Sequence, residues 1–180
     1  MKELEITPKY HHTKAGQAMF NFCARATIFL VKHRWLYYLL ACTWGIILTF
    51  VGWLITLVLG IGRIFTKKIK FEKYHWIYLI KAGPEYWGGF EMGLMFVRDQ
   101  KSWDSYINAH EFGHTFQNCV LGPLILFMVS LPSATRYWYI TLKYDRKGLT
   151  CPFEYDAVWF EDAATQCGEY ASNYLKNKIK

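Results

Sequence analysis

The chain has 180 residues and a formal net charge of +7, and 53% of its residues are hydrophobic. This length suits one domain, or a small domain joined to membrane segments, and a mean hydropathy of +0.03 is too low for a bundle buried wholly in a membrane. The five cysteines include no Cys-x-x-Cys pair, which argues against a cysteine zinc site, and their odd number argues against a disulfide framework.

The first third of the chain combines a polar start with a long apolar run. Within residues 1–34, residues 1–17 are predicted to be a loosely ordered polar segment, and residues 18–34 are predicted to form an amphipathic helix. Residues 35–62 contain no charged side chain and are predicted to span a membrane, since about 20 apolar residues suffice to cross one. A bend near Gly45 or Gly52 is the alternative for this run.

Basic residues flank the apolar run on both sides: Arg25, Lys32 and Arg34 before it, and Arg63, Lys67, Lys68, Lys70 and Lys73 after it. Such flanks are typical of contact with the anionic headgroups of a lipid bilayer. The excess on the C-terminal side favours the cytoplasmic face for the part that follows. The apolar run explains the charge better than nucleic-acid binding does, so we expect no nucleic-acid partner.

Residues 63–180 are predicted to form the functional domain. His75–Ile80 and Gly89–Val97 have the pattern of strands, and a helix capped by Ser102 or Asp104 should run to about Asn118. The apolar segment 119–141 follows directly and is predicted to insert into the membrane. Arg136 within it would cost a few kcal/mol there unless it is paired or reaches the interface.

The run His-Glu-Phe-Gly-His from His110 to His114 fits the HExxH pattern of zinc peptidases. On a helix its two histidines lie one turn apart on one face, where they can bind one Zn²⁺. Glu111 can reach a metal-bound water without being a ligand itself. Gly113 would let another element approach closely, and a separate apolar face of Ala109, Phe112 and Phe116 leaves the histidines unneeded for core packing. This disfavours the alternative of two core histidines.

Catalytic zinc needs a third protein ligand, and we predict that Glu161 supplies it. The metzincin solution fails, because Val120 stands where a third histidine would be. The segment 152–172 is predicted to be a helix that begins near Pro152. On that helix Glu161 shares a face of mostly small residues, which would allow a close helix–helix contact: Ala157, Val158, Ala164, Thr165 and Gly168.

Other acidic residues of this segment are weaker candidates. Glu154 and Asp156 are rivals for the ligand role, but both fall in the first turn of the predicted helix, where acidic residues favour the helix dipole. Asp162 and Glu169 lie on other faces of the helical wheel and are expected to be solvated.

An HExxH motif followed some forty to fifty residues later by a helical Glu-x-x-Ala resembles the gluzincin metallopeptidases. More closely, residues 110–117, 121–124 and 160–168 resemble small, poorly characterised bacterial membrane proteins with a His-Glu-x-Gly-His-x-x-Gln motif. This resemblance covers roughly residues 85–170. It implies zinc held by His110, His114 and Glu161, and Glu111 as the general base.

The sequence departs from the gluzincin pattern at one position, and one functional residue of the pattern is not assigned. Thr165 stands where an aspartate often follows the Ala of Glu-x-x-Ala. The residue that stabilises the oxyanion is not placed by any motif, and the candidates for that role are Tyr155, Tyr139, Tyr170 and His75.

Together these features predict an α+β, mainly helical fold: a membrane-associated minimal zincin with one or two membrane helices and a small β-hairpin or sheet beside the HExxH helix. The expected function is a membrane-embedded zinc metallopeptidase that hydrolyses a peptide or protein substrate, at a bacterial cytoplasmic membrane. The strand before the motif helix is either the edge on which substrate adds as a strand or a plain core strand.

Two alternatives remain for the function. One is a non-catalytic membrane interaction or scaffold protein with a structural or inactive zinc site, closed by a fourth ligand from Glu154, Asp156 or His75. The other is a small membrane-active protein that binds no metal.

Overall fold

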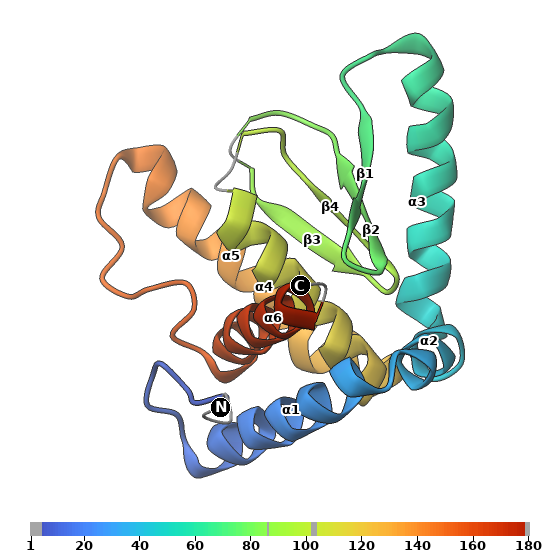
Figure 1. Cartoon of the computed structure of the whole chain (residues 1–180). Helices are drawn as coiled ribbons and strands as arrows, with labels where there is room; N and C mark the ends of the chain where they lie inside the picture. The colour runs from blue at the N-terminus through green and yellow to red at the C-terminus, as the bar shows by residue number, and fades with distance from the viewer. Residues whose placement is uncertain (1–4, 86, 102–103, 179–180) are drawn as a thin grey trace.

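The computed structural model describes residues 5–85, 87–101 and 104–178, and over these residues the protein is mainly helical with a small mixed sheet (Figure 1). The predicted α+β, mainly helical fold class is therefore confirmed. The longer elements are α1 (Lys14–Lys32), α2 (Arg34–Cys42), α3 (Ile46–Phe65), β1 (Lys70–Tyr74), β2 (Ile77–Lys81), β3 (Gly89–Met92), β4 (Met95–Arg98), α4 (Asp104–Leu121), α5 (Leu131–Lys143) and α6 (Trp159–Lys178). Short helical turns connect some of them: η1 (Gly122–Leu124), η2 (Leu126–Ser130) and η3 (Asp145–Lys147).

The sheet has the strand order β1-β2-β4-β3, so β3 lies at one edge. The pair β2–β4 is parallel, whereas β1–β2 and β3–β4 are antiparallel. The predicted single strand Gly89–Val97 is wrong, because Gly93 adopts a φ of 70° and folds the segment into the β3–β4 hairpin. The strand predicted at His75–Ile80 begins at Ile77, since His75 lies in the turn after β1.

The motif helix α4 packs on the sheet through the apolar face that its sequence predicts. Phe112 and Phe116 are fully buried in one cluster with Leu79 and Phe96 of the sheet and Tyr37 of α2. The helix extends past the predicted end at Asn118 to Leu121. Of the two proposed caps, Asp104 is the first helical residue, and Ser102 lies outside the described residues.

On its other side α4 packs against α6, and two glycines allow the two backbones to meet. A Cβ added at Gly113 would collide with the backbone of Ala164, and one added at Gly168 would collide with the backbone of Ala109. The backbone of Ala109 therefore takes part in this helix contact. The predicted close approach through Gly113 and the small-residue face of α6 is confirmed.

The start of α6 differs from the prediction. The helix begins at Trp159 rather than near Pro152, and residues 151–158 form an irregular connection. Asp156 therefore lies in a loop, whereas Glu161 and Asp162 occupy the first turn of the helix. Glu169 is exposed, as predicted.

The prediction that Asp162 is solvated is wrong, because the N-terminal segment covers it. The backbone N–H groups of Lys9 and Tyr10 donate to its carboxylate, and the Nε2 atom of His12 lies 2.8 Å from Oδ2. The described residues from 5 onward are thus held against α6, in contrast to the loose order expected. α1, which begins at Lys14 after an N-cap hydrogen bond from Gly16 N–H to Thr13 Oγ1, continues this contact along α6.

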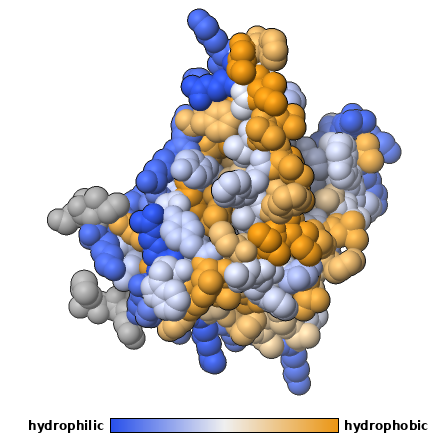
Figure 2. All heavy atoms as spheres, turned by 90° about the vertical axis from the view of Figure 1, so that its right-hand side faces the viewer, coloured by the Kyte–Doolittle hydropathy of each residue, from blue (hydrophilic) through white to orange (hydrophobic). Residues whose placement is uncertain are grey.

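The uncharged run 35–62 is two helices rather than one, because the chain turns at residues 43–45 between α2 and α3. Among the described helices, α3 has the length and hydropathy needed to cross a membrane, and 17% of its apolar window is buried. Figure 2 views the molecule from the side of α3 and shows hydrophobic residues gathered along this face. Hydrophilic residues lie toward the left of that view. The exposed large side chains of α3 include Phe50, Trp53, Leu57, Val58 and Ile64.

After α4 the chain bends sharply. The helical stretches Ser105–Leu124 and Leu126–Lys147 meet at an angle of 114°. The second stretch exposes further large apolar residues, among them Phe127, Leu131 and Trp138. Arg136 is paired here, since its guanidinium donates to the carbonyl oxygens of Tyr155 at 2.8 Å and Glu154 at 2.6 Å.

We expect Gly168→Ala to lower the free energy of unfolding by at least about 2 kcal/mol, because the added methyl group overpacks the α4–α6 contact. The matched control is Gly60→Ala on α3, where no atom lies within 4 Å of an added Cβ and the change should be neutral or slightly stabilising. Thermal unfolding of both variants measures this. Equal melting temperatures would contradict the tight contact.

Candidate functional site

The contact between α4 and α6 brings His110, His114 and Glu161 together. The Nε2 atoms of the two histidines are 3.1 Å apart, and Glu161 Oε2 lies 3.1 Å from His110 Nε2 and 3.3 Å from His114 Nε2. All three side chains are buried, and their potential ligand atoms lie within 4.8 Å of one another. The three predicted ligands thus form one cluster that could hold a metal ion.

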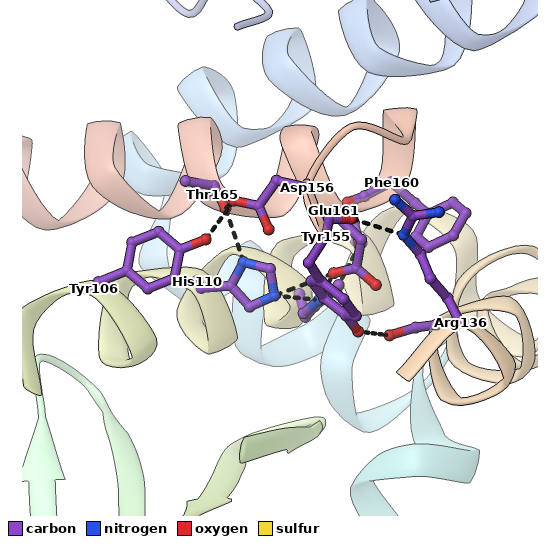
Figure 3. A network of polar contacts seen from close by, with 11 residues as sticks. Tyr106, His110, Arg136, Tyr155, Asp156, Phe160, Glu161 and Thr165 are labelled. Carbon is purple, nitrogen blue, oxygen red and sulfur yellow. Dashed lines mark hydrogen bonds and ion pairs between the residues drawn. The ribbon is translucent and has the colours of Figure 1, made fainter. Parts of the chain in front are cut away.

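Neighbouring residues fix which ring nitrogens of the histidines carry protons. Thr165 Oγ1 donates to Asp156 Oδ2 at 3.1 Å, so it accepts a hydrogen bond from His110 Nδ1 at 2.8 Å (Figure 3). Gln117 donates through its amide nitrogen to Phe160 O at 2.7 Å. Its Oε1 atom therefore faces His114 Nδ1 at 2.8 Å and accepts from it.

Both imidazoles, in their neutral forms, consequently point the Nε2 lone pair into the cluster. Two lone pairs and a carboxylate oxygen face one another there, and Glu161 Oε1 has no hydrogen-bond partner among the described residues. Ligands about 2.0–2.1 Å from a tetrahedral Zn²⁺ stand about 3.3–3.4 Å from each other. The spacings of 3.1, 3.1 and 3.3 Å are close to that value and fit one such ion.

The electrostatics of the cluster also favour a positive charge at its centre. In the metal-free protein burial opposes ionisation of Glu161, yet protonated His110 and His114 imidazoles donate to this carboxyl and hold its pKa well below its usual range. A bound metal cation would take the place of these protons, facing the Nε2 lone pairs of the neutral imidazoles. Burial likewise opposes protonation of His110, but Glu161 raises the pKa of its imidazole. A buried carboxylate that stays ionised between two imidazoles is the electrostatic setting in which a cation is stabilised.

Glu111 lies beside the cluster without joining it. Burial raises the pKa of its carboxyl to about 7, with a further increase from Glu161 and a decrease from His114. Its Oε2 atom has no hydrogen-bond partner among the described residues. Gly89 of the edge strand packs directly on it, since a Cβ there would lie 2.9 Å from Glu111 Oε1. The group is thus poised to exchange a proton near neutral pH.

A second layer of polar groups supports His110. Asp156 accepts hydrogen bonds from both Thr165 and the hydroxyl of Tyr106, and all of these groups lie close together in Figure 3. Position 165 has a threonine instead of an aspartate. Asp156, in the loop before α6, supplies a carboxylate that supports His110 indirectly, through the Thr165 hydroxyl. The supporting role of Tyr106 and Asp156 was not predicted from the sequence, because it depends on the path of the loop before α6.

The other proposed ligands do not reach the cluster. Glu154 is exposed and pairs with Lys9 at 3.3 Å, and the ring of His75 stacks on Phe112, toward the sheet. Asp156 is engaged by Thr165 and Tyr106. Within the described residues, the metal-ligand group therefore consists of three side chains, which leaves room for a further ligand from solvent or substrate.

A pocket of about 610 Å³ opens onto the cluster, lined by α4, β3 with the residues before it, the η2–α5 segment and the loop before α6. Of the four candidates for stabilising an oxyanion, Tyr155 lines this pocket, whereas Tyr139, Tyr170 and His75 do not. The Tyr155 hydroxyl lies 2.8 Å from Ser133 Oγ, and burial raises the pKa of its phenol. It is therefore a neutral hydrogen-bond donor.

Comparisons with protein families, with curated proteins and with solved structures found no match to this chain.

We expect Thr165→Val to weaken the affinity of the cluster for Zn²⁺ about 10- to 100-fold, because His110 Nδ1 loses its hydrogen-bond acceptor. A competition titration with a coloured chelator measures this affinity. The double change Thr165→Asp with Asp156→Asn returns one carboxylate directly to His110 and should restore most of it. If the double variant binds no better than Thr165→Val, the proposed support of His110 is wrong.

The raised pKa of Glu111 predicts a pH-dependent stability of the metal-free protein. Because the folded state binds this proton more tightly than the unfolded state, its contribution is complete below about pH 4.5 and is lost as pH rises through about 7. Glu111→Gln stays neutral, so between about pH 5 and about pH 8 it should gain about 2 to 3 kcal/mol relative to the parent protein. Chemical unfolding at the two pH values measures this, and a constant difference would contradict it.

Proposed function

We propose that this protein is a membrane-embedded zinc metallopeptidase that hydrolyses a peptide or protein substrate near the membrane face. The observation that carries the proposal is the convergence of two imidazole lone pairs and one ionised carboxylate on a single point at the floor of a pocket. Imidazole and carboxylate groups at these spacings are the ligand set of gluzincin-type zinc sites, and Zn²⁺ held there would polarise a carbonyl group and activate a water molecule.

Glu111 is the proposed general base. Its carboxyl faces the pocket beside the ligands, and its pKa of about 7 allows it to accept a proton from water and then to pass it to the leaving amine. Because Gly89 has no side chain, the Glu111 carboxyl packs directly against the backbone of the edge strand, and this contact holds the carboxyl in place. Tyr155, a partly buried neutral phenol in the same pocket, is the proposed donor to the developing oxyanion.

The edge strand β3 is the proposed docking site for the substrate backbone. Gly88, Gly89, Phe90 and Glu91 line the pocket, and the side of β3 away from β4 has no strand partner among the described residues. An extended peptide can add to such an edge through backbone hydrogen bonds. Of the two interpretations of the strand before α4, the substrate edge is thus favoured for β3, and β4 is the internal strand.

The membrane part of the proposal rests on α3 and the bend after α4. α3 has no charged residue before Arg63 in its last turn and is mostly exposed, unlike the buried core helix of a soluble protein. Arg63 lies in its last turn, and Lys67, Lys68, Lys70 and Lys73 follow it, which suits anionic headgroups. We propose that α3 spans a bacterial cytoplasmic membrane, that segment 119–141 inserts into it, and that the site lies at the cytoplasmic face.

The second candidate is a membrane scaffold protein with a structural or inactive zinc site. A structural site is usually closed by four protein ligands. Glu154, Asp156 and His75 stand apart from the described three-ligand cluster, and the pocket reaches it, so these observations favour the catalytic proposal.

We expect Glu111→Gln to keep one equivalent of zinc and to lose at least about 10³-fold in peptide hydrolysis, because the amide cannot accept the proton from water. His114→Ala should lose both the zinc and the activity. Metal analysis of purified protein in lipid nanodiscs and cleavage of a casein reporter measure the two properties.

Two results would contradict the peptidase proposal. Unchanged hydrolysis by Glu111→Gln would remove its general base. Normal zinc content in both His110→Ala and His114→Ala would show that the metal, if bound, is held elsewhere in the chain.

A further inference from the structure

The wall of the pocket formed by η2 and α5 differs from the wall that carries the cluster. Its described lining residues include Val129, Ala134, Tyr137, Trp138 and Ile140, and none of the lining residues from these two elements is charged. Trp138 lines the pocket and still exposes 53% of its surface, so it stands at the opening. The pocket therefore has an ionised floor and a neutral, largely apolar side wall.

The size of the pocket exceeds what the cleavage chemistry requires. A volume of about 610 Å³ falls within the range of pockets that enclose a drug-sized ligand. The cluster and Glu111 need space for a carbonyl group and a water molecule. The remaining space next to the apolar wall is sufficient for at least one large side chain.

The edge strand β3 suits a substrate that binds as an extended peptide and carries this large side chain. Side chains of an extended peptide alternate between the two faces of a strand. A peptide added to β3 therefore directs some of its side chains toward the floor and wall of the pocket and the others away from them. Gly88, just before β3, has open space where a side chain would stand, so a peptide backbone can approach the pocket there.

We propose that the η2–α5 wall is a specificity subsite for a large apolar side chain next to the cleaved bond, so that the substrate is an apolar peptide segment. This proposal rests on the peptidase function proposed above and adds the class of substrate. Burial of an apolar side chain against Val129, Ala134 and Tyr137 stabilises the bound peptide, whereas an acidic side chain loses its hydration there and meets no Lys or Arg among the described lining residues. The exposed apolar residues Phe127 and Leu131 of the same segment fit a substrate drawn from a membrane.

The test uses zinc-loaded Glu111→Gln protein in lipid nanodiscs, so that neither cleavage nor detergent interferes with binding. Short peptidyl hydroxamates that differ in one side chain, Leu, Ala or Glu, are titrated by calorimetry. With three more carbons buried at about 0.8 kcal/mol each, the Leu probe should bind about 10- to 50-fold more tightly than the Ala probe. The Glu probe should bind more weakly than the Ala probe.

A variant pair locates the effect on the wall. Ala134→Trp fills the subsite and should abolish the preference for Leu over Ala, with zinc content measured to show that the cluster is intact. The matched control is Thr135→Trp on the neighbouring residue of α5, which is exposed like Ala134 but does not line the pocket. This control should retain the preference.

The outcomes separate this inference from the function on which it rests. Equal binding of the Leu and Ala probes, or a preference that survives Ala134→Trp, would overturn the apolar subsite and leave the peptidase proposal standing. Binding of octanohydroxamate as tightly as the Leu probe would assign the pocket to an acyl chain instead of a peptide. Failure of every hydroxamate to bind the zinc-loaded protein would overturn both proposals.

Discussion

The site depends on direct contact between the backbones of α4 and α6. Two glycines, Gly113 and Gly168, remove the side chains that would hold these helices apart. Because Glu161 has a short side chain, it reaches the histidines only when its helix lies this close. One packing constraint thus sets both the stability of the helix pair and the spacing of the three ligand atoms.

A second consequence of this contact concerns charge. Burial at the helix interface removes water from Glu161, and this would normally favour its neutral form. The two imidazoles reverse that tendency, while Glu111, one residue from His110 in sequence, remains dominated by burial and has a pKa of about 7. Two neighbouring carboxyl groups therefore hold opposite protonation tendencies, as the proposed ligand and the proposed proton carrier require.

Local patterns in the sequence were sufficient for the elements that carry the site. The HExxH spacing and the small-residue face of Glu161 predicted both helices and the residues that meet between them. The hairpin within Gly89–Val97 was missed because its turn depends on the φ of one glycine, and residues 152–158 were assigned to a helix because a proline with acidic residues mimics a helix start. The burial of Asp162 could not be predicted, since its partners lie up to 153 positions away in the chain.

That long separation bears on how the protein is made. Residues 5–65 emerge from the ribosome first, so α3, the proposed membrane helix, is made while the rest of the chain is still being synthesised. The cluster forms later, once α6 has emerged and docked on both α1 and α4. Since Glu161 follows His114 by 47 residues, a nascent chain presents the histidine pair before it has the carboxylate. The hydrolytic centre proposed for this protein would thus stay incomplete until translation is nearly finished.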